Sequence, residues 1–382
     1  MKQPTRIDLE ALQRDLDALR TRITADLGED DAAYIRNVRR VKQALEVSGR
    51  TLIHVSLDPV TFGVGVVGLA LSKILENMEL GHNVMHGQYD FMGDAAFDSK
   101  TYEWDIVGTA KTWKKAHNVT HHTYTNVLGK DDDFGYAVFR LSSDQEWKPH
   151  HLFQMLLSPL AGLAFDHMVS YYHARTSEYL TAEKGTDAYR AAVREMLADW
   201  LAIAKKSLGM YAKEYAFYPA LAGPFAPKVA LGNALAHTIR NVWSYAVIQC
   251  GHLPESANTY TEEDMKGETR GGFYLRQITG SCNIDAGPIL GILTGHLSHQ
   301  IEHHLFPDVP AHRYREMAVE VRRVCDEHGI AYNTGTFREQ LASVFRALIR
   351  YSVPNAPNDR RARAAEIYEL PRRGAAERAT AV

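Results

Sequence analysis

Histidine is the residue whose spacing in this sequence points most directly to chemistry. Half of the 18 histidines lie in three short windows, GHNVMHG, HNVTHH and GHLSHQIEHH. The windows contain nine of them: His82, His86, His117, His121, His122, His296, His299, His303 and His304. Positions four apart share one face of a helix, so each window can present two imidazoles to one point.

Adjacent histidines add a second feature to this pattern. The pairs His121–His122 and His303–His304 would point about 100° apart on a helix, so each pair can bind two neighbouring metal ions. The spacing therefore predicts a dinuclear metal site. Imidazole binds iron, copper, nickel and zinc, and the spacing does not choose among these metals.

Metal binding explains the clusters better than an ordinary structural role. A single pair of histidines four residues apart is more often a surface pair or a satisfied core pair. Three clusters buried without a metal would instead leave many imidazoles without partners, at a cost in stability for each. The other histidines are interpreted as surface or ordinary hydrogen-bonding residues: His54, His150, His151, His167, His173, His237, His312 and His328.

His252 is an exception, because it ends a long apolar segment in the sequence QCGHLPE. Two membrane crossings between the second and third windows would return the chain to the face on which the three windows lie. We therefore predict that His252 is a further metal ligand.

Composition excludes several other classes of protein. The net charge is −3 and the basic residues form no single cluster, so nothing favours nucleic-acid binding. Cys250, Cys282 and Cys325 lie far apart without a CxxC pair, which argues against a disulfide framework, a thiolate zinc site or a redox motif. The N-terminal residues are charged and lack the apolar segment of an export signal.

The elements that must position the histidines are predicted to be helical. Residues 5–48 have the pattern of a polar amphipathic helix, and residues 151–174 that of an interfacial or core helix. The apolar stretch 51–78 is broken near Asp58 and Pro59, which indicates a bent helix or short hairpin at a bilayer. Segments 215–227 and 229–248, split at Pro227 and Lys228, fit a membrane hairpin. Mean hydropathy is only −0.29, and no apolar run reaches about 18 residues.

The order of the windows resembles the three histidine boxes of membrane fatty-acid desaturases. Similarity extends to ILENMELGHNVMHGQYDFM, HNVTHHTYTNVLGKDDDFGY, QCGHLPE, FYLRQITGSCNI and LSHQIEHHLFPDVPAHRYREMA, which look like bacterial acyl-CoA desaturases of the actinobacterial and pseudomonad type. The resemblance covers roughly residues 45–345. It implies an all-α fold in which about two hairpins of membrane helices lie below a helical cytosolic cap that holds the dinuclear site.

The same resemblance implies a domain division and a ligand set. The domains would be a polar helical extension (1–48), a desaturase domain (49–345) and a polar tail (346–382). The tail ends in PRRGAAERATAV, a segment that is expected to be disordered. Eight ligands are implied: His82, His86, His117, His121, His122, His252, His303 and His304. The third box leaves alternatives open, because Gln300 occupies its first position while His299 lies one residue earlier, and either could reach a metal. His296 would be a ligand, a partner of a ligand, or neither.

The activity implied is oxygen-dependent desaturation of a long acyl chain, most commonly at the 9,10 position of stearoyl- or palmitoyl-CoA. Two Fe²⁺ ions and O₂ would be required. The chain lacks the HPGG signature of a fused haem domain, so electrons would come from a separate NADPH-dependent flavin and iron–sulfur reductase. The protein would be a multi-pass protein of a bacterial cytoplasmic membrane, with its active site facing the cytoplasm.

Supporting roles are expected for several polar residues. Asn118, Glu302 and Asp90 are candidates for holding the metal-binding imidazoles in place. Alternatively, Asn118 caps a helix, Glu302 lies at the surface and Asp90 belongs to a turn. An apolar tunnel is expected to be lined from 60–80 and 215–250. Four cations could contact the phosphates of CoA or simply form a solvated face: Lys111, Lys114, Lys115 and Arg270.

Two other functions share these histidines. A membrane hydroxylase or alkane monooxygenase would use similar boxes to insert oxygen, and a metal-binding or transport protein would hold metal without turnover. Zinc hydrolysis is disfavoured, because no HExxH motif is present.

Overall fold

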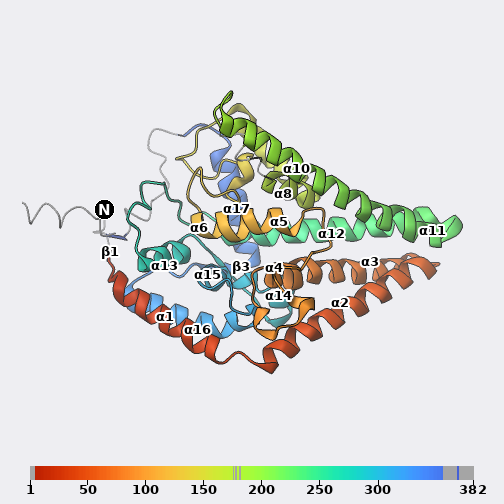
Figure 1. Ribbon diagram of the computed structural model, residues 1–382, viewed down its shortest axis with the longest axis horizontal. Helices are drawn as coiled ribbons and strands as arrows, with labels where there is room; N and C mark the ends of the chain where they lie inside the picture. Colours follow the sequence, from red (N-terminus) through yellow and green to blue (C-terminus); the bar gives the residue numbers. More distant parts are fainter. Residues whose placement is uncertain (1–4, 175, 177–178, 180–181, 356–367, 370–382) are drawn as a thin grey trace, which may run out of the picture.

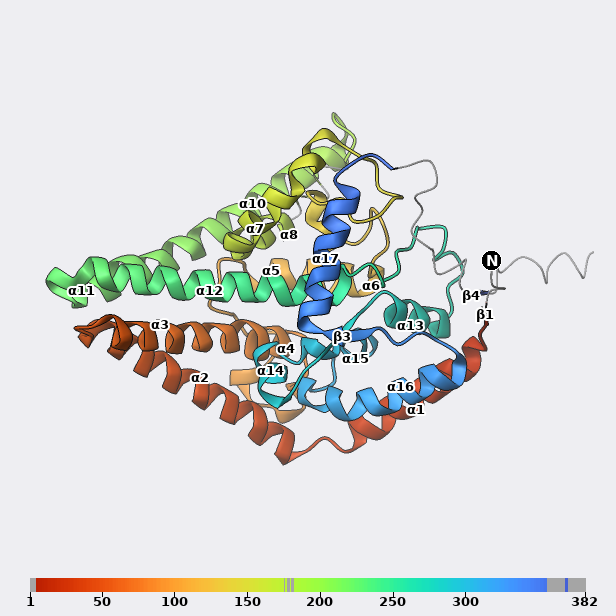
Figure 2. The same ribbon diagram turned by 180° about the vertical axis from the view of Figure 1, so that it is seen from behind.

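Two long helical hairpins and a helical cap make up the part of the chain that the structure describes. The computed structural model describes residues 5–174, 176, 179, 182–355 and 368–369. Figures 1 and 2 show the closed ends of both hairpins together at one end of the molecule, opposite β1. The strands of the described chain are short, so the expected helical fold is confirmed.

The first hairpin is formed by α2 (Glu29–Val55) and α3 (Pro59–Ile74), and a π-helix, η1 (Leu75–Gly81), and α4 (His82–Met85) continue α3. The Asp58 carboxylate accepts hydrogen bonds from the backbone N–H groups of Val60 and Thr61, at 2.9 Å each. With Pro59 in the first turn, this cap starts α3 directly after the reversal. The sequence predicts either a bent helix or a short hairpin near Asp58, and the chain adopts the hairpin.

The second hairpin turns earlier than predicted. A continuous helical segment of α10 (Asp187–Tyr211), η7 (Ala212–Phe217) and α11 (Tyr218–Leu221) runs against α12 (Ala226–His252). The chain reverses at η8 (Gly223–Phe225), where Gly223 has φ +54°. Pro227 lies in the first turn of α12, a position that needs no N–H donor, so the predicted break at Pro227 and Lys228 is wrong.

Glycines allow α2 and α3 to pack closely within the first hairpin. A Cβ on Gly65 would lie 2.8 Å from the Ile53 backbone nitrogen, and a Cβ on Gly49 would lie 2.6 Å from the Leu69 nitrogen. No side chain fits at either contact without separating the helices. Gly63, in the same helix, has no atom within 4 Å of its Cβ position.

Gly65→Ala should therefore lower the free energy of unfolding by about 1–3 kcal/mol, as expected for overpacking. Gly63→Ala is the matched control, and it should be neutral or stabilising by up to about 1 kcal/mol, because alanine is the better helix former. Thermal unfolding of both variants in detergent checks this. Equal midpoints for the two variants would contradict close backbone packing at Gly65.

The cap is built around α1 (Leu9–Ala25), α13 (Arg270–Thr279), α15 (Gln300–Leu305) and α16 (Tyr314–His328). Helix α1 lies against α13 and α16, and its leucines enter their common core: Leu9, Leu12, Leu16 and Leu19. The predicted polar segment 5–48 is thus two helices with different neighbours. The proposed boundary at residue 48 falls inside α2.

The remaining elements complete the cap and the wall of the site. Helices are α5 (Ala110–Trp113), η4 (Lys114–His121), α6 (His122–Tyr124), α7 (Gln154–Leu163), α8 (Phe165–His173), α14 (Pro288–Leu293) and α17 (Phe337–Tyr351); shorter 3-10 turns are η2 (Asp90–Met92), η3 (Ala95–Phe97), η5 (Gly135–Ala137), η6 (Pro149–Phe153), η9 (Leu297–His299) and η10 (Ala311–Arg313). Strand β2 (Asn283–Asp285) pairs in parallel with β3 (Thr334–Thr336), and β1 (Thr5–Arg6) with β4 (Tyr368–Glu369).

Two further segments differ from their predicted form. The single helix expected at 151–174 is wrong, because α7 and α8 are separate helices, and the segment 149–163 meets α8 at a bend of 95°. The predicted tail, 346–382, begins inside α17, and residues 356–367 and 370–382 lie outside the described residues.

One helix of the described chain, Pro59–Met85, is both long enough and apolar enough to span a membrane, and it is continuous through α3, η1 and α4. The bent pair Pro149–Leu163 and Phe165–His173 meets the same criterion only if the two helices are taken together.

Candidate metal centre and substrate cavity

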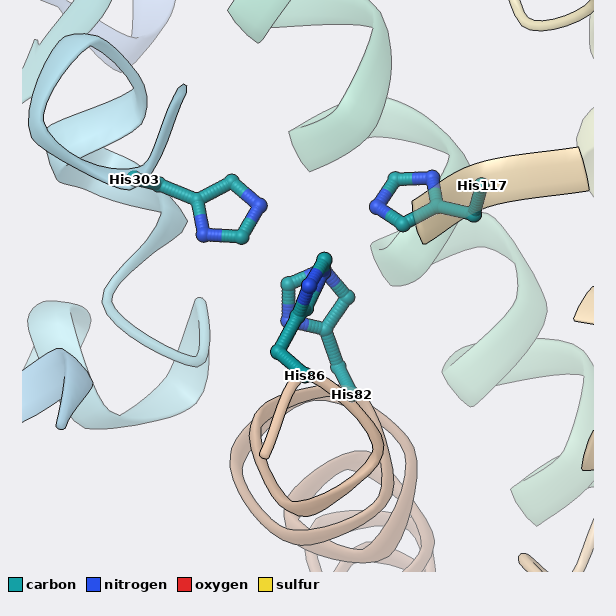
Figure 3. Close-up of side chains that lie close together, drawn as sticks. All are labelled: His82, His86, His117 and His303. Atoms are coloured by element: carbon teal, nitrogen blue, oxygen red, sulfur yellow. The ribbon is translucent and has the colours of Figure 1, made fainter. Parts of the chain in front are cut away.

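Four histidines from three separate segments converge on one point (Figure 3). His82 and His86 come from α4 and its C-terminal end, His117 from η4 and His303 from α15. Their nearest ring nitrogens all lie within 4.8 Å of one another. Because four imidazoles at this spacing can share a single ion, the group is a candidate metal site.

A second group lies beside the first. His121, His252 and His304 place their ligand atoms within 4.8 Å of one another, and a third group joins His122 to His303 and His304. Of the adjacent pair, His303 belongs to the first group and His304 to the second, as the spacing of such pairs predicts. His122 links the first group to the second, so the eight histidines form the two neighbouring groups that a dinuclear centre requires.

Unpaired nitrogen atoms show that these rings are arranged for something other than hydrogen bonding. In the histidine groups, six buried Nε2 atoms have no hydrogen-bond partner within the described residues: those of His82, His86, His117, His122, His303 and His304. Leaving so many buried polar atoms unsatisfied is costly unless a ligand occupies them. The donor set therefore fits a pair of metal ions.

The protonation state of the rings also suits metal binding. Burial lowers the pKa of His117 to about 4 and holds the pKa values of His122, His303 and His304 well below the ordinary value. These imidazoles are therefore neutral near pH 7. Neutral imidazole is the form that coordinates a metal.

An apolar cavity opens onto both histidine groups. It contains about 810 Å³ of empty space, its open mouth included. His82, His117, His121 and His252 line it together with apolar side chains from several elements: Met78, Trp104, Trp113, Tyr136, Phe165, Val169, Ile248 and Leu297. A long apolar ligand in this cavity would lie directly beside the metal-binding rings.

Comparison with known proteins agrees with this geometry. Residues 59–336 match the family model described as fatty acid desaturase. The chain belongs to the fatty acid desaturase family. The resemblance of its histidine boxes to that family is thereby confirmed, as is the expectation that the protein is an oxidoreductase.

Three curated relatives illustrate how far the similarity extends. The desaturase is 41% identical to the NADPH-dependent stearoyl-CoA 9-desaturase of Mycobacterium tuberculosis over 355 residues, 92% of this chain and 82% of the relative. It is 29% identical to the sn-1 linoleoyl-lipid 6-desaturase of Synechocystis sp. over 76% of this chain and 81% of the relative. Bovine fatty acid desaturase 3 is 25% identical over 64% of this chain and 51% of its own length.

Two aspartates of the desaturase support the second histidine box. Asp131 accepts a hydrogen bond from His121 Nδ1 at 2.8 Å. Asp133 lies between His117 Nδ1, at 2.9 Å, and His173 Nε2, at 2.6 Å. The two contacts made through Nδ1 fix the rings of His117 and His121 and leave the Nε2 atom of each as the ligand atom. Burial opposes protonation of His121, but Asp131 and Asp133 outweigh it and raise the pKa of His121 to about 9.

Sequence reasoning missed all three of these supporting residues. His173 was assigned an ordinary hydrogen-bonding role, whereas its buried ring contacts the carboxylate that holds His117. The acidic GKDDDFGY loop, which follows the HH pair after TYTNVL, is the available signal for Asp131 and Asp133. Acidic side chains that follow a histidine box are natural acceptors for the ring N–H groups.

The third box places Gln300, rather than His299, beside the metal-binding rings. Gln300 Nε2 lies 2.8 Å from His252 Nε2, and its buried Oε1 has no partner within the described residues. His299 belongs to none of the histidine groups, and its Nδ1 lies 3.2 Å from Ser298 Oγ. His296 is also outside them, at 3.0 Å from the Tyr34 hydroxyl.

The three predicted supporting residues lie in different surroundings. Asn118 donates to the Met85 carbonyl at 2.8 Å and so ties η4 to α4. Glu302 is buried and accepts from Asn283 and Tyr332, and burial raises its pKa to about 7. Asp90 is exposed and bonds to Ser99. None of the three contacts a ring of the histidine groups.

The four cations considered for CoA binding do not form one patch. Lys111 pairs with Asp199, and Lys114 donates to the Ser99 carbonyl, both near α5 and η4. Lys115 is half-buried in η4. Arg270 pairs with Asp17 where α13 packs on α1, away from α5 (Figure 1).

The walls of the cavity also differ from prediction. Of the expected range 60–80, only the end near Met78 lines it, and of 215–250 only the last turns of α12 do. Much of the wall comes from residues 104–113 and from α8, because α8 packs across α12 at the level of the histidines.

Proposed function

We propose that this desaturase inserts a double bond at the 9,10 position of a long-chain acyl-CoA such as stearoyl- or palmitoyl-CoA. The observation that carries the proposal is the apolar cavity that opens directly onto two linked histidine groups. The relative with 41% identity, a stearoyl-CoA 9-desaturase, supports the substrate and the position.

Iron is the metal we infer for the site. An unactivated methylene cannot be oxidised by any amino-acid side chain, and two Fe²⁺ ions with O₂ would supply that oxidising power. His82, His86, His117 and His303 would hold one ion, and His121, His252 and His304 the other. His122 lies between the groups, and Gln300 is close enough to His252 to complete the second site.

The protein's own residues bind and orient the acyl chain. Trp113 stacks on His117 with ring centroids 4.5 Å apart, so the cavity wall and a metal-binding ring form one rigid surface. Val169 and Phe165 face the same space from α8. These side chains exclude water and hold a methylene pair beside the site, which is the positioning that selective oxidation needs.

The surface of the hairpins supports a membrane location. Leu57, Val60, Leu221 and Phe225 are large apolar residues exposed at the closed ends of both hairpins. We infer that these ends insert into the cytoplasmic membrane of a bacterium while the cap and its active site face the cytoplasm. A separate flavin and iron–sulfur reductase would deliver electrons there. The name of the Mycobacterium tuberculosis relative supports NADPH as the source of these electrons.

Product analysis tests the proposal. Purified protein would be incubated with stearoyl-CoA, O₂, NADPH and a reductase, and double bonds located by mass spectrometry of derivatised products. We expect a 9,10 olefin and two equivalents of iron. A hydroxylated product without olefin would identify a hydroxylase. Bound zinc or nickel with no NADPH-dependent oxygen uptake would identify a metal-binding protein.

A further inference from the structure

Gln277 joins the second and third histidine boxes, although it belongs to neither. It lies in α13, which packs against α15, and its side chain is 0% exposed. Its Nε2 donates a hydrogen bond to the His122 backbone carbonyl at 3.2 Å, and its Oε1 lies 3.0 Å from His304 Nδ1. One amide from a separate helix therefore contacts the second box through the backbone and the third box through a ring.

These two contacts allow only one orientation of the Gln277 amide. A backbone carbonyl can only accept a hydrogen bond, so the NH₂ end of the amide must face His122. The oxygen end then faces His304, and this oxygen can only accept. The hydrogen atom of the His304 ring is thereby placed on Nδ1, and Nε2 keeps its lone pair. Acting through Gln277, the His122 carbonyl fixes the tautomer that a metal ligand needs.

A second oxygen near His304 fits the same tautomer. Thr125 Oγ lies 3.2 Å from His304 Nδ1, and the Thr125 hydroxyl donates to the His121 carbonyl at 2.9 Å. Because its hydrogen is used there, the hydroxyl oxygen is an acceptor toward His304. The opposite ring nitrogen, Nε2, is buried and has no hydrogen-bond partner within the described residues. The protein thus holds His304 by Nδ1 and leaves Nε2 for a metal ion.

The contacts of Gln277 lie on one side of the centre. His304 shares a group with His121 and His252, and the ring of His122 stacks on the ring of His304 with centroids 4.4 Å apart. Within the described residues, Gln277 makes no hydrogen bond to the histidines of the first group, which are His82, His86, His117 and His303. Loss of the amide should therefore affect the two groups unequally.

We propose that Gln277 is a positioning residue of the second metal site, which fixes His304 in the tautomer and orientation that direct Nε2 to the ion. The inference rests on the two-metal centre of the proposed function. Without the amide, the His304 ring loses the acceptor that holds its hydrogen on Nδ1. The neighbouring His122 loses the donor to its backbone carbonyl, and neither of its ring nitrogens has a partner within the described residues. The second ion, but not the first, is then bound weakly.

Two substitutions separate this role from a role in packing. Gln277→Glu keeps an acceptor for His304 Nδ1, whether the new carboxyl group is ionised or neutral. Gln277→Met keeps the length of the side chain but removes both hydrogen bonds. A positioning role predicts that glutamate is tolerated better than methionine. A role in packing alone predicts the opposite order, because burying a carboxyl group costs more than burying a thioether.

Gln154→Met is the matched control. Gln154 lies in α7 and is also 0% exposed. Its Oε1 accepts from the Arg140 backbone N–H at 2.9 Å, and its Nε2 donates to the Arg140 carbonyl at 3.2 Å. The control therefore loses buried hydrogen bonds of the same kind, but none of them holds a histidine of the centre.

Titration of each apoprotein with Co²⁺ tests the proposal, with bound metal counted by elemental analysis and the ligand field recorded by visible absorption. We expect two tightly bound equivalents in the wild-type protein, in Gln154→Met and in Gln277→Glu. Gln277→Met should bind one equivalent tightly and the second about 10–100-fold more weakly, the usual effect of removing the hydrogen-bond partner of a metal ligand. Restoration of the second equivalent by glutamate is a result that packing does not give.

The possible outcomes are distinct. Two tight equivalents in Gln277→Met, or a weaker second site in Gln277→Glu than in Gln277→Met, would overturn the positioning role. A lower unfolding temperature in Gln277→Met with both equivalents retained would show that the amide serves packing. Fewer than two equivalents in the wild-type protein would contradict the two-metal centre and this inference with it. A wild-type protein that binds two ions but forms no olefin would contradict desaturation and leave the role of Gln277 intact.

Discussion

Replacing His303 by alanine should abolish desaturation and remove metal from the protein. His303 belongs both to the group with His82, His86 and His117 and to the group with His304. Loss of a supporting partner of a metal ligand commonly costs about 10–100-fold in metal affinity or activity, and loss of a shared ligand should cost more. Metal analysis and the stearoyl-CoA assay, performed on the same preparation, check this.

His299→Ala is the matched control for this prediction. His299 lies four residues away in the same box but in none of the histidine groups, and its ring nitrogen contacts only Ser298 within the described chain. It should retain metal and nearly full activity. If His299→Ala lost metal while His303→Ala kept it, the ligand assignment of the third box would be reversed.

Asp131→Asn should give the second-largest effect among these variants, a loss of about 10–100-fold in metal affinity. Asp131 accepts the Nδ1 proton of His121 at 2.8 Å and also holds the backbone N–H of Asn126 at 2.7 Å. An amide of the same shape offers one acceptor fewer, so His121 would lose its fixed orientation or tautomer. Titration of the apoprotein with a divalent metal measures the change.

Glu302→Gln provides the comparison for Asp131→Asn. Glu302 is also a buried carboxyl next to metal-binding histidines, but it contacts Asn283 and Tyr332 rather than an imidazole. Its replacement should leave metal affinity close to that of the wild-type protein. Equal losses in the two variants would mean that general packing around the site, rather than the hydrogen bond to His121, determines metal affinity.

The sequence by itself determined the histidine pairs and the need for a metal. Side chains four apart on an α-helix share a face, so His82 and His86 could be paired without any structure. His117 and His121 are also four apart, but they lie in the π-helix η4, and the proposed sites place them on different ions. The adjacent histidines likewise indicated two metals, because neighbouring side chains on a helix diverge. These are local consequences of helix geometry, and they hold only where the helix is continuous. Between His299 and His303 it is not, because α15 begins at Gln300.

Tertiary structure decided which other groups join the histidines. His299 and Gln300 are adjacent in sequence, and only the packing of α15 against α12 turns Gln300, rather than His299, toward His252. His173 reaches Asp133 across 40 residues, and α8 rather than the hairpins supplies much of the cavity wall. Such contacts depend on how whole helices pack, and the spacing of residues within one segment carries no record of that packing.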